Sequence, residues 1–233
     1  MTTFRYSPEI VTRYPHVVGG VILASGLRNG PTVDTLLAAY QAEQEATIQR
    51  IGDTPLSQLP SLAAWRSVFR GFGVDPTQYR CAAEALLRRL TKKGAIPSIN
   101  TLVDVGNLVS IRYALPVAIF DTRAIHGAVT VRFSNGSEQF ITLGEGAADH
   151  LPPSEAIFAD EANLVIARRW CWRQSDESAA RDDTTDALIT VEAHHENGHT
   201  DVAAAVDALL ALLNTYASGA CTAHVLDTDH PEV

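Results

Sequence analysis

The spacing of apolar residues changes about halfway along the chain. Up to residue 113, apolar side chains recur every three to four positions, which predicts helices at 31–51, 61–70, 76–94 and 98–113. Beyond Pro116 the apolar residues occur in short alternating runs, which predicts strands at 117–120, 127–133, 138–143, 156–159, 164–172 and 187–193. Residues 4–27 are rich in β-branched side chains and predict extended chain, and Asp201 is expected to cap a last helix that ends near Tyr216.

Turn residues and element order together predict the fold class. Asn135-Gly136 is a strong hairpin signal between the strands at 127–133 and 138–143, and residues 160–163 form a second turn. Because the strands cluster instead of alternating with helices, we expect an α+β fold with a mixed or antiparallel sheet and helices packed on it. We divide the chain into an N-terminal strand-helix extension (1–60), a main domain (61–217) and a frayed tail (218–233).

Composition narrows the class of protein. The chain has 233 residues, of which 46% are apolar, enough for one large folded domain. Its longest apolar stretch, residues 17–27, is shorter than the roughly 20 residues that a membrane-spanning helix needs. Three cysteines at unrelated spacings suggest free thiols, so we expect a cytoplasmic protein with no membrane partner.

Charge is distributed unevenly. The net charge is −9, which argues against binding nucleic acid by bulk electrostatics and leaves no expectation of a DNA partner. Residues 1–175 nevertheless carry a net charge of +2 and residues 176–233 a net charge of −11, while the segment 66–93 carries +5. That segment is either a set of ordinary solvated helix faces or a local basic surface on an acidic molecule.

A polar stripe on an apolar helix is the strongest candidate site. Asn100, Asp104 and Asn107 are spaced by four and three residues, which places them on one side of the predicted helix at 98–113. Buried polar groups need partners, so the stripe either lines a cleft or belongs to a structural hydrogen-bond network. Asp121, after the apolar run 117–120, is either its partner or the cap of the following turn.

A second candidate combines arginine with tryptophan. In the run 168–173, strand alternation sends Arg168, Trp170 and Trp172 to one face and Arg173 to the other. Such side chains can stack on bases and bind phosphate, although they also occur in ordinary sheet cores. We interpret Cys171 as an inert core thiol, because no flanking base is evident.

Histidines do not indicate a metal. His194, His195 and His199 straddle a turn, and no carboxylate or thiol completes a known ligand spacing, so we expect neither a metal nor a cofactor.

Several motifs together resemble a known family. Val103-Asp104 with Asn107, Pro116 with Phe120-Asp121, Trp170-Cys171-Trp172-Arg173 and the downstream Thr184 occur in the order and spacing of the B3/4 module, the aminoacyl-tRNA editing region of the phenylalanyl-tRNA synthetase β chain, in its stand-alone form. The resemblance extends over residues 65–192. It implies an α/β module with a pocket between helix and sheet.

The resemblance also implies a function. In the synthetase this pocket hydrolyses wrongly esterified tRNA, so a free-standing deacylase would use Asn100, Asp104, Asn107 and Asp121 in the pocket. The 3′ end of the tRNA would contact Arg168, Trp170, Trp172, Arg173 and Thr184. This chain has Ala118 where the synthetase has a histidine, and no glutamate falls on the family's position. The alternatives are a non-catalytic binder of tRNA and a protein that binds or hydrolyses an amino-acid-like small molecule.

Overall fold

Two sheets form the centre of the molecule. The computed structural model describes residues 2–142 and 148–233. The larger sheet has five strands in the order β1-β4-β7-β8-β9, in which β1 and β4 are parallel and the other neighbours antiparallel. Its strands are β1 (Thr3–Tyr6), β4 (Ala128–Phe133), β7 (Ala156–Ala159), β8 (Val165–Arg168) and β9 (Arg173–Gln174).

The second sheet is fully antiparallel and has the order β11-β2-β10-β3. It consists of β2 (Val18–Ser25), β3 (Val117–Asp121), β10 (Ala187–Ala193) and β11 (Ala220–Leu226). A separate pair, β5 (Gln139–Ile141) and β6 (Ala148–His150), completes the strands found in the described residues.

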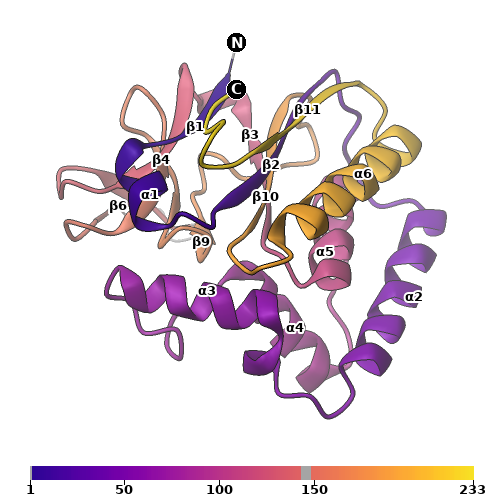
Figure 1. Cartoon of the computed structure of the whole chain (residues 1–233). Helices are drawn as coiled ribbons and strands as arrows, with labels where there is room; N and C mark the ends of the chain where they lie inside the picture. The colour runs from indigo at the N-terminus through magenta and orange to yellow at the C-terminus, as the bar shows by residue number, and fades with distance from the viewer. Residues whose placement is uncertain (1, 143–147) are drawn as a thin grey trace.

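The helices pack mainly around the four-stranded sheet (Figure 1). They are α1 (Pro8–Arg13), α2 (Asp34–Ile51), α3 (Pro60–Gly71), α4 (Ala82–Lys93), α5 (Thr101–Tyr113) and α6 (Gly198–Tyr216), with short 3-10 turns at Leu56–Gln58 and Thr122–Ala124. Helix α6 packs on β2 and β10, and it approaches closely because Gly20 has no side chain. A Cβ at Gly20 would lie 2.4 Å from a methyl carbon of Val206 and 2.7 Å from one of Val191.

The same contact fixes which way β10 faces. Val191 points toward α6, and side chains alternate along a strand, so Thr190 and Glu192 point to the opposite face. There the Tyr6 hydroxyl of the larger sheet donates a hydrogen bond of 2.7 Å to Glu192. The end of the chain also returns to the larger sheet, because Val233 and Phe4 exchange two backbone hydrogen bonds.

The predicted fold class is confirmed, with helices packed on antiparallel-rich sheets. The strand predicted at 187–193 matches β10, and the strand at 117–120 is one residue shorter than β3. Within residues 2–142 and 148–233, no helix is long and apolar enough to cross a membrane.

One predicted hairpin is wrong. The turn at Asn135-Gly136 forms, with Glu138 accepting from the backbone N–H groups of both residues, but β5 does not pair with β4. Strand β4 already has β1 on one edge and β7 on the other, so no edge remains for β5, which pairs with β6 instead. The predicted strand also reached Leu143, which lies outside the described residues.

The tail expected to fray is instead a strand of the sheet. Residues Ala220–Leu226 pair along β2, from Ala220 opposite Ser25 to Leu226 opposite Gly19. The turn into this strand depends on Gly219, whose φ is +88°.

Helix starts also differ from the predictions. Ser7 accepts a hydrogen bond from the N–H of Ile10 and Pro8 occupies the first helical turn, so α1 interrupts the extended N-terminal run. The helix expected from Pro76 begins only at Ala82, where the Ala82 N–H donates to the Cys171 carbonyl at 2.9 Å. Asp201 is not a cap: it lies in the first turn of α6 and its carboxylate contacts His195 at 2.7 Å.

A pair of glycine variants tests the docking of β11. A Cβ at Gly219 would lie 2.6 Å from the Ser25 carbonyl oxygen, whereas Gly73, with φ of +84°, has no atom within 4 Å of such a Cβ. Both Gly219→Ala and Gly73→Ala force alanine into left-handed backbone, but only Gly219→Ala adds a clash with β2. We expect Gly219→Ala to lower the free energy of unfolding, measured with urea, by at least about 1 kcal/mol more than Gly73→Ala does. Equal effects would mean that residues 218–233 fray.

Candidate functional site

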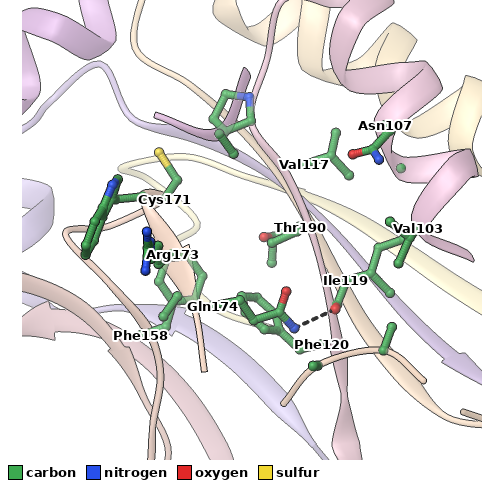
Figure 2. Close-up of a pocket in the computed structure, with 18 of the residues that line it drawn as sticks. Val103, Asn107, Val117, Ile119, Phe120, Phe158, Cys171, Arg173, Gln174 and Thr190 are labelled. Carbon is green, nitrogen blue, oxygen red and sulfur yellow. Dashed lines mark hydrogen bonds between the residues drawn. The ribbon is translucent and has the colours of Figure 1, made fainter. Parts of the chain in front are cut away.

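A cavity of about 270 Å³ lies between α5, strands β3 and β10, and the segment 170–174 (Figure 2). Figure 2 shows Asn107 on one side and Cys171 with Arg173 on the other, with Thr190 between them. Its walls are largely apolar, and the side chains that form them include Val103, Val117, Ile119, Phe120, Phe158 and Trp170. The cavity is thus of the kind that takes a small organic group, with a few polar side chains to orient it.

The segment after β8 builds the floor and the mouth of the cavity. Arg169 and Trp170 have φ angles of +45° and +60°, which ends the strand alternation that the sequence predicted through residue 172. The turn sends Trp170 into the core, where it is fully buried and its indole N–H donates to Glu192 at 2.9 Å. Trp172 and Arg173 then reach the mouth, where the Arg173 guanidinium lies 4.7 Å from the Trp172 ring centre.

Glu192 is the acidic side chain in the cavity wall. The Tyr6 hydroxyl and the Trp170 N–H both bond to its Oε1 atom. Burial raises the pKa of Glu192 to about 7, although these two hydrogen bonds act in the opposite direction. Burial likewise raises the pKa of the neighbouring Cys171 thiol, aided by contact with Cys81, which favours the protonated thiol at neutral pH.

Asn107 is the member of the predicted polar stripe that faces the cavity. It is half-buried on α5, close to Val117, and its side chain also interacts with the buried Tyr40 hydroxyl. Asn100 is not on the helix at all: it caps α5, accepting from the Val103 N–H at 3.0 Å, and it is buried.

Asp104 is sealed in a structural network. It is fully buried and accepts hydrogen bonds from the Thr32 hydroxyl at 2.6 Å, the Ile99 N–H at 3.0 Å and the Ser98 hydroxyl. The bond from Thr32 ties α5 to the segment before α2, and the other two donors lie just before α5 itself. Asn100 and Asp104 therefore belong to a structural hydrogen-bond network, whereas Asn107 lines a cleft.

Asp121 and Thr184 also form a structural pair away from the cavity. Asp121 caps the 3-10 turn that follows β3 and accepts from the Arg123 guanidinium at 2.6 Å and from the Thr184 hydroxyl at 2.5 Å. Burial opposes ionisation of Asp121, but the hydrogen bonds from Arg123 and Thr184 hold its pKa below the usual value. Neither side chain lines the cavity.

Arg168 is likewise unavailable to a ligand. Its guanidinium makes a two-pronged ion pair with Glu155, at 2.9 and 3.0 Å, and only 6% of the residue is exposed. Of the side chains predicted to bind the 3′ end, the structure brings Trp172 and Arg173 to the mouth, places Trp170 in the floor, and buries Arg168 and Thr184 elsewhere.

A basic groove adjoins the mouth. It is lined by one side of α4 together with Trp172 and Arg173, which line the cavity as well. We call Arg88, Arg89, Lys92 and Lys93 the α4 cation stripe; all four are exposed, and the spacing of three and four residues places them along one side of the helix. No described residue forms an ion pair with any of them.

Sequence reasoning missed Glu192, Thr190 and Gln174 as cavity residues. A signal existed for Glu192, because it is a charged residue inside the otherwise apolar run 187–193. The histidines contribute no such site. His194 packs among Trp65, Trp170 and Tyr14, and within the described ranges no three metal-ligating side chains gather.

These features define a compact α+β module with one apolar cavity and a basic groove at its mouth. The chain belongs to the B3/4 domain family, whose model matches residues 64–217, about two thirds of its length. The family resemblance found in the sequence is thus confirmed.

The chain is similar to one region of much longer proteins. It is 28% identical over 122 residues to the phenylalanine–tRNA ligase β subunit of Shewanella oneidensis, which covers 52% of this chain and 15% of that one. It is 36% identical over 87 residues to the same subunit of Gloeobacter violaceus, covering 37% and 11%. An N-terminal fragment of the phenylalanyl-tRNA synthetase β subunit from Pyrococcus horikoshii aligns in structure with a TM-score of 0.49 and 12% identity, over 94% of this chain and 50% of that one.

Two variants separate the structural from the exposed part of the polar stripe. Asp104→Ala leaves three donors without an acceptor in the core, so we expect it to lower the free energy of unfolding by about 3 kcal/mol. Asn107→Ala removes an amide at the cavity wall, and we expect a loss of under about 1 kcal/mol. Urea unfolding of both variants checks this, and a loss for Asn107→Ala as large as that for Asp104→Ala would make the whole stripe structural.

Proposed function

We propose that this chain binds the aminoacylated 3′ end of a tRNA, with the aminoacyl group in the cavity and the phosphates on the α4 cation stripe. The observation that carries the proposal is the junction of the two surfaces. Trp172 and Arg173 line both the cavity and the basic groove, so one extended ligand can occupy both.

Family membership supports a role related to tRNA synthetases. The relatives are named as β subunits of a tRNA ligase, and this chain matches a region that is 11–15% of the length of the two compared above. The similarity is therefore to one module of the ligase, and the activity of the whole ligase does not follow from it.

The cavity has a suitable size for the aminoacyl group. A cavity of roughly 150 Å³ holds benzene, so about 270 Å³ accommodates an amino-acid side chain together with its backbone atoms. The nucleotides of a tRNA are too large to enter and would lie along the groove outside.

Electrostatics support a polyanion at the groove. The four cations of the stripe have no acidic partner among the described residues, and the partly buried ring of Trp172 lines the groove at the same place. Phosphates bind such stripes by releasing counterions, and bases stack on indole rings with little sequence preference.

Deacylation at this site would be ester hydrolysis. Water adds to the aminoacyl carbonyl, the ribose hydroxyl leaves, and the free amino acid is released. Of the four residues first considered for catalysis, only Asn107 lines the cavity, and its amide N–H₂ is a donor suited to the carbonyl oxygen as negative charge develops there. We therefore assign contact with the ester to Asn107 alone.

A second candidate is a binder of a free amino-acid-like small molecule. The net charge of −9 favours it, because a small ligand needs no basic footprint. The two candidates differ in whether the α4 cation stripe matters for binding.

Charge removal on α4 tests the tRNA proposal. We expect Arg88→Gln/Lys92→Gln to weaken retention of aminoacylated tRNA and to reduce the slope of log K against log salt by roughly 1.4, at about 0.7 per cation for single strands. The matched control is Arg28→Gln/Arg70→Gln, which removes two exposed arginines that line none of the cavities described above. Equal slopes in the two variants, or no retention by the wild type at low salt, would leave only the small-molecule candidate.

Release of amino acid from a panel of mischarged tRNAs tests hydrolysis. We expect release that requires Asn107 and is lost at least tenfold in Asn107→Ala, while tRNA retention is kept. Retention without any release by the wild type would make the chain a non-catalytic binder.

A further inference from the structure

Glu192 is a buried carboxylate without a cation. Only 2% of the residue is exposed, and no lysine, arginine or histidine among the described residues forms an ion pair with it. Burying a charge without a partner is costly, so buried carboxyl groups are generally paired, coordinate a metal or shift their pKa toward the neutral form.

The charged and titratable groups around it do not compensate for this charge. Tyr6 reaches it from β1 and Cys171 from the segment before β9, and both are neutral because burial raises their pKa values. His194, which directly follows β10, packs on the Trp170 ring, and burial lowers its pKa to about 3, so it is neutral as well. Helix α3 contributes the Trp65 indole N–H, which bonds to the backbone oxygen of Glu192 and not to the carboxylate.

The carboxylate is held so that one oxygen remains for a ligand. Tyr6 and Trp170 approach from two different segments and both bond to Oε1, and no described residue donates to Oε2. Glu192 lines the cavity, so a ligand group there meets an oriented anion.

Other acceptors lie in the same wall. Thr190 precedes Glu192 on the same face of β10. The side-chain N–H₂ of Gln174 donates hydrogen bonds to the backbone oxygens of Ile119 and Ser178. Figure 2 shows the side-chain oxygen of Gln174 on the side of Thr190. Aromatic rings of Phe120, Phe158 and Trp170 form neighbouring walls, and aromatic faces attract cations.

We propose that the cavity binds a primary ammonium group, with Glu192 as its counter-ion and Thr190 and Gln174 as further acceptors. The proposal rests on the proposed use of the cavity as a ligand site. It deepens that function by requiring a ligand with a free, protonated amine. For an aminoacyl ester this is the α-ammonium; a side-chain ammonium has the same chemistry.

Matched small probes test the site in the full chain. At pH 8 we expect calorimetric titration to show phenethylamine binding at least tenfold more tightly than 2-phenylethanol, which has the same shape and no charge. Glu192→Gln should abolish that preference. Glu161→Gln, which changes an exposed glutamate outside the cavity, should keep it.

The pH dependence of phenethylamine binding to the wild-type protein is a second test, and it needs no variant. An ammonium requires the ionised carboxylate, and the pKa of Glu192 is about 7, so the ionised fraction rises roughly tenfold between pH 6 and pH 8. Phenethylamine should therefore bind more tightly at pH 8 than at pH 6 by a factor approaching ten, and 2-phenylethanol should not change.

Two further probes identify the source of the ammonium. At pH 7, where both the α-ammonium and the ionised form of Glu192 are populated, we expect L-phenylalanine methyl ester to bind and its N-acetyl derivative to lose at least tenfold in affinity. We expect Nα-acetyl-lysine methyl ester to bind no better than that derivative. Tighter binding of the lysine ester would assign the site to a side-chain ammonium and overturn the α-ammonium assignment.

The proposal fails if amine and alcohol bind alike at pH 8, if neither binds, or if the preference survives Glu192→Gln. The failure is separable from that of the tRNA proposal. Salt-sensitive tRNA retention without an amine preference would overturn the ammonium site alone, and an amine preference without tRNA retention would overturn the tRNA proposal alone.

Discussion

The burial of one carboxylate determines how the two sheets meet. Glu192 belongs to the four-stranded sheet, while Tyr6 and Trp170 come from the first strand of the larger sheet and from the turn after β8. Two donors on one buried carboxylate offset part of its desolvation and hold three distant segments in one arrangement. The cavity lies beside this carboxylate, between α5 and the segment 170–174. Its floor and its mouth are therefore set by the same backbone turn at Arg169 and Trp170.

Elements were predictable from the sequence where the periodicity was strong, and strand partners were not. Apart from Thr190 and Glu192 the run 187–193 is apolar, so β10 could be located to the residue. The Asn135-Gly136 turn was also recognisable, but whether β5 pairs with β4 depends on β1, more than 120 residues earlier, which already occupies that edge. The strand Ala220–Leu226 gave a weak signal because it lies at the sheet edge, where most of its side chains are only partly buried.

The candidate site shows the same division between local pattern and long-range partner. Spacing placed Asp104 and Asn107 on one side of a helix, which is true, but spacing does not say what that side contacts. The acceptor role of Asp104 depends on Thr32, 72 residues away, and the burial of Arg168 depends on Glu155 across the sheet. Trp172 and Arg173 reach the mouth only because the chain leaves the strand at Arg169, a change of backbone that no residue type in that run announced.

The net charge of the chain says little about what its groove meets. At physiological ionic strength, charges beyond about 8 Å are largely screened, so an approaching phosphate responds to the nearest side chains. Those are the four cations along α4, whereas Asp227, Asp229 and Glu232 belong to the C-terminal segment, which Figure 1 shows at the opposite end of the molecule from α4. Inside the cavity the acidic side chain is Glu192, while Arg173 lies where the cavity meets the groove. A ligand that is anionic along its length and cationic at its tip satisfies both potentials at once, and an aminoacyl ester at the end of a nucleic acid has that distribution of charge.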